Sequence, residues 1–87
     1  MPRKLLAANW KENPRTEKGA LALFRAVSKM KPARNLGVAV CPPFVYLEKI
    51  AEVHRRLKKH HLALGAQDVF WEEGGPYTSA VGPHMLR

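Results

Sequence analysis

Two side chains near the start of the chain, Asn9 and Lys11, place an amide and a cation directly after a short apolar run, residues 5–8. An ammonium group attracts phosphate and other anions, and an amide can donate hydrogen bonds to an oxygen that gains negative charge during a reaction. The end of such a run is where a ligand site would be built. On its own, Asn-Trp-Lys also fits an ordinary polar loop.

The apolar run is the first of three with the length and composition of buried strands, at residues 5–8, 36–41 and 62–66. The stretches between them carry apolar residues at helical spacing, which predicts helices after Pro14 and after Pro43. Alternating strands and helices are typical of a parallel α/β sheet, where ligands bind at the carboxyl ends of the strands. Asn9 and Lys11 would lie at that edge.

Each predicted helix has an identifiable start and one apolar side. Thr16 is expected to cap the first helix and Pro32 to end it, and Pro83 is expected to open a third helix. The apolar stripe of the first helix comprises Ala20, Leu21, Leu23, Phe24, Val27 and Met30, and that of the second comprises Leu47, Ile50, Ala51, His54 and Leu57.

The connection after the third predicted strand, residues 67–80, is much longer than the usual ~2 to 6 residues. It contains three aromatic residues, Phe70, Trp71 and Tyr77, which are poor components of a flexible linker. We therefore expect this segment to pack against something.

Composition limits the remaining possibilities. The 87 residues form at most one domain, residues 1–87, and no apolar run reaches the ~20 residues of a membrane helix. Cys41 is the only cysteine, so an internal disulfide cannot form, and no cluster of residues has metal-ligand spacing. These features favour a cytoplasmic protein with no membrane partner.

The formal net charge of +8 raises the possibility of a basic module that binds nucleic acid. The basic residues are spread over every segment, with one concentration at residues 55–61, where cations also complement the end of the second helix. No aromatic residues are interleaved with them, and no known RNA- or DNA-binding motif is present. We therefore predict no nucleic-acid partner and keep this module as an alternative.

Four stretches in order resemble the triosephosphate isomerase family: residues 8–13 (ANWKEN), 38–47 (VAVCPPFVYL), 64–69 (LGAQDV) and 72–78 (EEGGPYT). The resemblance implies the N-terminal part of a (β/α)8 barrel, with its strands 1–3, helices 1–2 and the start of helix 3. Because such a barrel needs about 250 residues, we expect a truncated domain or one completed by another chain.

The same resemblance implies a function. The family interconverts dihydroxyacetone phosphate and D-glyceraldehyde 3-phosphate, a step of glycolysis and gluconeogenesis, through an enediolate and without a cofactor. Lys11 corresponds to a catalytic and substrate-binding lysine, and Asn9 to a substrate-binding asparagine. The family's glutamate base and histidine electrophile lie on later strands, so we expect residues 1–87 alone to be inactive.

The resemblance also implies a homodimer formed through the loop at residues 68–80. Gln67, Tyr77 and Thr78 correspond to positions at the dimer interface. Ser79 and Ala80 replace a glycine and a glutamate of the family's loop, Glu12 replaces an apolar residue, and Gly82 replaces a serine, which raises the question of how the loop docks. A self-associating or complementing barrel segment without activity is the remaining alternative.

Overall fold

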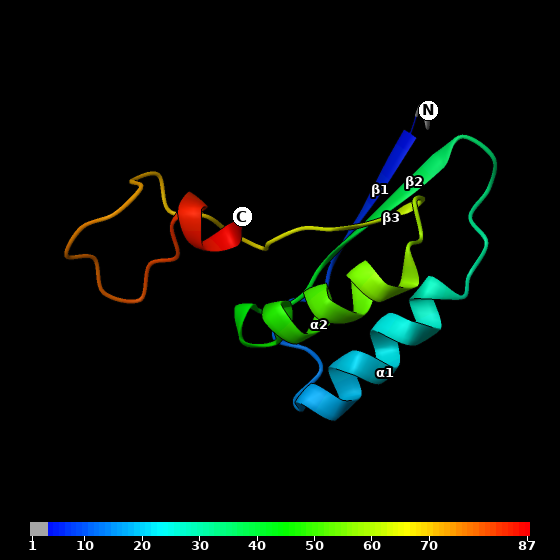
Figure 1. Ribbon diagram of the computed structural model, residues 1–87, viewed down its shortest axis with the longest axis horizontal. Coiled ribbons are helices and arrows are strands. Elements are labelled where there is room, and N and C mark those ends of the chain that lie inside the picture. The colour runs from blue at the N-terminus through cyan, green and yellow to red at the C-terminus, as the bar shows by residue number, and fades with distance from the viewer. Residues whose placement is uncertain (1–3) are drawn as a thin grey trace.

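The computed structural model describes residues 4–87 and consists of a parallel sheet covered by helices on one face (Figure 1). The elements follow the order β1 (Lys4–Asn9), α1 (Glu17–Ser28), β2 (Leu36–Cys41), α2 (Phe44–Leu57), β3 (Leu62–Leu64) and a 3-10 helix, η1 (Pro83–Leu86). The strands lie in the order β1-β2-β3. The predicted α/β alternation is confirmed.

The boundaries of two strands agree closely with the prediction, whereas β3 is shorter than predicted. It ends at Leu64, not at Ala66, although the Gly65 N–H still donates to the Val40 carbonyl at 2.8 Å. A Cβ atom at Gly65 would lie 3.0 Å from the Cys41 sulfur, so glycine lets the chain pass close to β2. Beyond this point the chain leaves the ladder and turns towards the ends of β1 and β2.

Helix α1 begins as predicted and ends earlier than predicted. The Thr16 hydroxyl accepts a hydrogen bond from the Gly19 N–H at 3.0 Å. The helix ends at Ser28, whose hydroxyl donates to the Arg25 carbonyl at 2.6 Å, before Pro32 is reached. Met30 therefore lies outside the helix and is 66% exposed, so its assignment to the apolar stripe was wrong, as was that of the exposed Leu23.

The core lies between the two helices and one face of the sheet. It is formed by Ala20, Phe24, Val40, Ile50 and Leu62. His54, predicted on the apolar side of α2, is half-buried there: its Nε2 lies 2.6 Å from the Leu62 carbonyl oxygen, and its ring meets Phe24 edge-on at 6.1 Å. The helix thus bonds directly to the start of β3.

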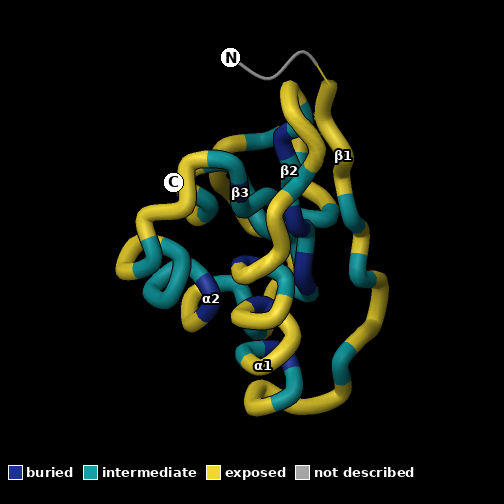
Figure 2. The backbone as a smooth tube through the Cα atoms, turned by 90° about the vertical axis from the view of Figure 1, so that its right-hand side faces the viewer, coloured by how far each residue is buried: buried dark blue, intermediate teal, exposed yellow. Residues whose placement is uncertain are grey.

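Strand β1 is much less covered than β2 (Figure 2). Leu5 and Leu6 are 68% and 55% exposed, although apolar side chains of a parallel sheet are normally buried on both faces. The sheet is open, with β1 and β3 as its two edges. Among residues 4–87, no helix is long and apolar enough to cross a membrane.

Replacement of Thr16 by Ala is expected to lower the free energy of unfolding by about 1 kcal/mol, because the Gly19 N–H loses its acceptor at the start of α1. Thr16→Ser keeps the hydroxyl and should keep most of the stability. Urea unfolding followed by circular dichroism measures both variants, and equal losses would contradict the capping role.

Candidate active site

Asn9 and Lys11 lie where β1 ends and are held by a compact turn. The Asn9 Oδ1 accepts a hydrogen bond from the Lys11 backbone N–H at 2.9 Å. Lys11 has a left-handed backbone with φ of 60°, a conformation unusual for a residue with a side chain. The Asn9 side chain therefore helps to hold the lysine in a backbone setting that it would rarely adopt alone.

The polar tips of these two residues are open to a ligand. Both residues are exposed, and neither the Lys11 Nζ nor the Asn9 Nδ2 has a hydrogen-bond partner within residues 4–87. Trp10, between them, joins the site to β2 because its N–H donates to the Cys41 carbonyl at 3.1 Å. A cation and an amide donor are thus anchored at the carboxyl edge of the sheet.

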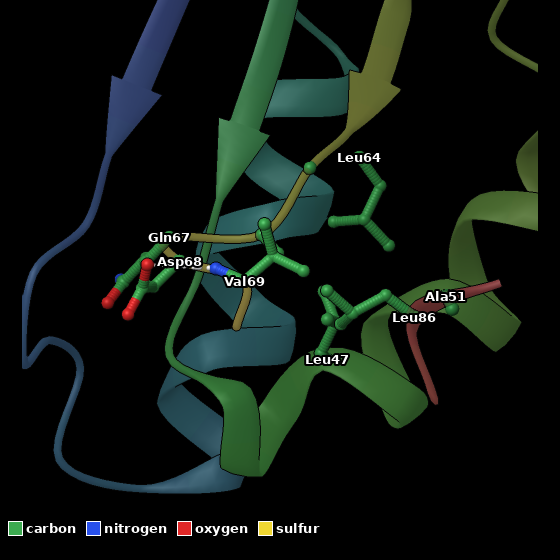
Figure 3. A pocket seen from close by; sticks show the side chains of 9 residues that line it. Leu47, Ala51, Leu64, Gln67, Asp68, Val69 and Leu86 are labelled. Atoms are coloured by element: carbon green, nitrogen blue, oxygen red, sulfur yellow. Dashed lines mark hydrogen bonds between the residues drawn. The ribbon is translucent and has the colours of Figure 1, made fainter. Parts of the chain in front are cut away.

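Gln67, in the chain that follows β3, holds this site in place. Its Nε2 donates to the carbonyl of Lys11 at 2.8 Å and to the carbonyl of Cys41 at 3.0 Å. Figure 3 shows the Gln67 side chain pointing towards the ends of β1 and β2. One amide group therefore ties together the chain segments that follow all three strands, and it acts directly on the lysine backbone.

This positioning role of Gln67 was not predicted from the sequence, which placed the residue only at a dimer interface. A sequence signal existed: a polar side chain follows an apolar strand at the edge where the ligand site was expected. Its bond to Lys11 joins residues 56 positions apart, and only the folded chain reveals that contact.

The arrangement can stabilise negative charge. An unpaired ammonium group and an amide donor on one edge suit a phosphate group or a developing oxyanion, because such donors need no rearrangement during the reaction. Within residues 4–87, no cluster of three or more His, Cys, Asp or Glu side chains could hold a metal ion. Glu12, next to Lys11, is exposed.

The long connection forms a loop, residues 70–82, that is closed at its base and projects away from the sheet (Figure 1). The Phe70 N–H donates to the Val81 carbonyl at 2.7 Å, and the Phe70 ring packs on Tyr77 with centroids 4.6 Å apart. The aromatic residues thus pack partly on one another, as expected of an ordered segment. Trp71 nevertheless remains 79% exposed.

Tyr77 and Thr78 lie in this loop and are exposed. The loop projects away from the sheet, so it does not return to the end of β1 in the same chain (Figure 1). Of the five residues predicted for the site and interface, the structure therefore groups Asn9, Lys11 and Gln67 at the sheet edge. The other two stand on the projecting loop.

Ser79 carries backbone strain within the loop. Its φ is 61°, in the left-handed region that favours glycine. Ser79→Gly should therefore raise the free energy of unfolding by up to about 1 kcal/mol. Ala80→Gly is the control, because Ala80 lies outside the left-handed region, and it should not raise the free energy of unfolding. Equal gains for the two variants in thermal unfolding would contradict backbone strain at Ser79.

A groove of about 590 Å³ lies between α2 and the chain that leaves β3, and Lys11 is not among the residues that line it. Its apolar lining includes Leu47, Leu64, Val69 and Leu86, whereas Gln67 and Asp68 point towards the ends of β1 and β2 (Figure 3). The groove marks the uncovered edge of β3 and is separate from the Lys11 ammonium.

The amino-acid sequence is similar to those of curated triosephosphate isomerases. The chain is 38% identical over 87 residues to the triosephosphate isomerase of Caldanaerobacter subterraneus subsp. tengcongensis, of which it covers 34%. It is 40% identical over 86 residues to that of Xanthomonas campestris pv. campestris, of which it covers 33%. The chain thus spans about a third of the length of these curated relatives.

The family model for triosephosphate isomerase matches residues 4–87, which include every element of the structure. The open sheet of three parallel strands with two helices corresponds to the N-terminal part of the family's (β/α)8 barrel. The strand order, the Asn-Trp-Lys segment at the end of β1 and this match show that the chain belongs to the triosephosphate isomerase family.

Proposed function

We propose that the protein carrying this chain interconverts dihydroxyacetone phosphate and D-glyceraldehyde 3-phosphate. The observation that carries the proposal is the unpaired ammonium of Lys11 beside the amide of Asn9 at the carboxyl edge of the sheet. Membership of a family whose curated relatives are triosephosphate isomerases supports it. No cofactor takes part in this proposal.

The proposed reaction is a proton transfer. A base takes a proton from C1 of dihydroxyacetone phosphate, and the carbonyl oxygen on C2 becomes negative. The C1 hydroxyl proton then moves to the oxygen on C2, and return of the proton from the base to C2 leaves the aldehyde at C1. In this scheme Lys11 is a catalytic residue that faces the substrate phosphate and the developing oxyanion, and Asn9 donates a hydrogen bond to the substrate. The base comes from polypeptide outside residues 4–87.

The proposed assembly is a homodimer in which the loop at residues 68–80 reaches a partner subunit. The exposure of Trp71, Tyr77 and Thr78 supports this, because aromatic side chains concentrate in protein interfaces. Gln67 would contribute to the interface indirectly, by holding the backbone turn at Lys11 in place. The strained Ser79 lies next to Thr78 and would affect how the loop docks.

The chain would form part of one barrel domain, in a cytoplasmic protein, with additional polypeptide beside β1. The exposed Leu5 and Leu6 favour such completion. They also favour the second candidate, a segment that associates with itself or complements a barrel without activity. Sedimentation of residues 1–87 distinguishes the two: a compact monomer would contradict association through the open edges.

The isomerase proposal is tested with the protein at its full natural length. Glyceraldehyde 3-phosphate is supplied in deuterated water, and product formation and deuterium at C1 of dihydroxyacetone phosphate are followed by NMR. Rapid conversion with solvent deuterium in the product is expected for an enediolate. No conversion by a folded protein would overturn the proposal. Residues 1–87 alone should show no conversion.

A further inference from the structure

The end of the molecule opposite the active site carries a concentration of cations. This basic end consists of the start of β1, the connection from α1 to β2, the last turn of α2, and the connection from α2 to β3. Its charged residues are Lys4, Lys29, Lys31, Arg34, Arg55, Arg56, Lys58 and Lys59, and all of them are exposed.

The parallel topology brings these cations together. Each helix runs back against the strands, so the carboxyl ends of α1 and α2 lie at the end where the strands begin (Figure 1). Backbone hydrogen bonds join the segments: the Lys4 N–H donates to the Asn35 carbonyl at 3.1 Å, and the Val38 N–H donates to the His61 carbonyl at 2.9 Å. Charges scattered along the sequence thus share one end.

The carboxylates lie elsewhere. The seven acidic residues are Glu12, Glu17, Glu48, Glu52, Asp68, Glu72 and Glu73, and none belongs to the connections at the basic end. Glu52, one helical turn before Arg55 and Arg56, is the nearest along the chain. No Lys or Arg side chain in the described part of the chain lies within 4.0 Å of a carboxylate, so the basic charges are not neutralised by ion pairs.

We propose that the basic end binds the phosphate backbone of double-stranded nucleic acid. From the sequence we predicted no such binding, because the cations are spread over every segment. The fold nevertheless places eight of them at one end, where no carboxylate lies. A strongly basic chain with its Lys and Arg side chains on one face has the electrostatic features of a nucleic-acid-binding surface.

The uncharged residues of this end favour a duplex over other polyanions. No Phe, Tyr or Trp side chain is exposed there and His60 is its one exposed imidazole in residues 4–87, so single-stranded bases have little stacking surface. Leu5, Leu6 and Met30 are exposed there, but none of them lies on a helix, so this end lacks the amphipathic helix that inserts into a membrane surface. Phosphate contacts need only cations and carry no base specificity. The binding is therefore independent of sequence.

The test measures the affinity of the full-length protein for a fluorescent duplex of about 20 base pairs, by anisotropy, between about 50 and 200 mM salt. If about four to six phosphates are contacted, affinity should fall roughly 10² to 10³-fold over this range. Absence of binding at about 50 mM salt by the folded wild-type protein overturns the proposal without recourse to any variant.

Two variants of equal charge locate the site. The first carries Lys31→Gln, Arg34→Gln, Arg55→Gln and Lys59→Gln at the basic end. The second carries Arg15→Gln, Lys18→Gln, Lys49→Gln and Arg87→Gln, which are exposed cations elsewhere. Both lower the formal net charge from +8 to +4. Circular dichroism verifies that both variants fold.

The first variant should bind at least about tenfold more weakly at 100 mM salt, with a shallower salt dependence, while the second should lose less than about threefold. Equal losses would show that only total charge matters and would overturn the proposal. Binding to vesicles of phosphatidylserine and phosphatidylcholine, sensitive to the first variant and without duplex binding, would assign the basic end to a membrane instead.

Discussion

Replacement of Lys11 by Met should lower kcat/KM for triose phosphate isomerisation by about 10³-fold or more. Methionine keeps the length and much of the volume of the side chain but removes the charge. The ammonium has no partner within residues 4–87, so it contributes nothing evident to folding and is free for the substrate. The loss should therefore appear in catalysis with little change in the free energy of unfolding.

The control for this variant is Lys18→Met, which removes an exposed cation from α1. Its kcat/KM should stay within about threefold of the wild-type value, because long-range effects of exposed charges are screened by salt. A coupled assay with glyceraldehyde 3-phosphate measures both variants. Comparable losses in the two, or a fully active Lys11→Met, would remove Lys11 from the catalytic role.

Replacement of Gln67 by Leu should lower kcat by roughly 10- to 100-fold, although the side chain is not expected to touch the substrate. Leucine has a similar volume but cannot donate to the carbonyls of Lys11 and Cys41. The Lys11 carbonyl then loses its donor, whereas the Cys41 carbonyl keeps the Trp10 N–H, so the cost is about 0.5–1.5 kcal/mol of stability. The turn that carries the ammonium also loses its link to the third strand.

A positioning role differs from simple destabilisation, and Thr16→Ala separates the two. That variant should lose stability of a similar order by uncapping α1, while the hydrogen bonds of Gln67 to the Lys11 and Cys41 carbonyls stay in place. Its kcat should remain near the wild-type value at a temperature where both variants are folded. If Gln67→Leu loses stability but keeps full kcat, Gln67 is a structural residue only.

Much of the fold follows from local patterns in the sequence. Residues 36–41 were predicted as a strand and form β2, because a short apolar run closed by two prolines has few alternatives. Thr16 caps α1 as predicted, because its hydroxyl needs only the neighbouring backbone. Features determined within a few residues were therefore accessible to sequence reasoning.

The ends of two elements, one set by a local contact and one by a distant contact, were less accessible. Met30 continues the apolar spacing of α1, but the Ser28 hydroxyl bond to Arg25 accompanies an earlier end of the helix. The early end of β3 accompanies the close approach of Gly65 to Cys41 on the neighbouring strand. Each outcome is decided by local or tertiary contacts that hydrophobic spacing does not encode.

The site shows the same division. Asn9 and Lys11 were placed at the end of a strand from their position after an apolar run, and the structure confirms that place. The bond between Gln67 and Lys11 requires the register of three strands, so it emerged only from the structure. The gathering of cations at the basic end also arises from topology and not from any local motif.

The most direct test of the account is a crystal structure of the full-length protein with glycerol 3-phosphate, a stable analogue of the triose phosphates. The account predicts the ligand at the carboxyl edge of the sheet, with the Lys11 ammonium and the Asn9 amide within hydrogen-bond distance and Gln67 still bonded to the lysine carbonyl. A ligand bound elsewhere, with the Lys11 side chain turned away from the ends of the three strands, would contradict it.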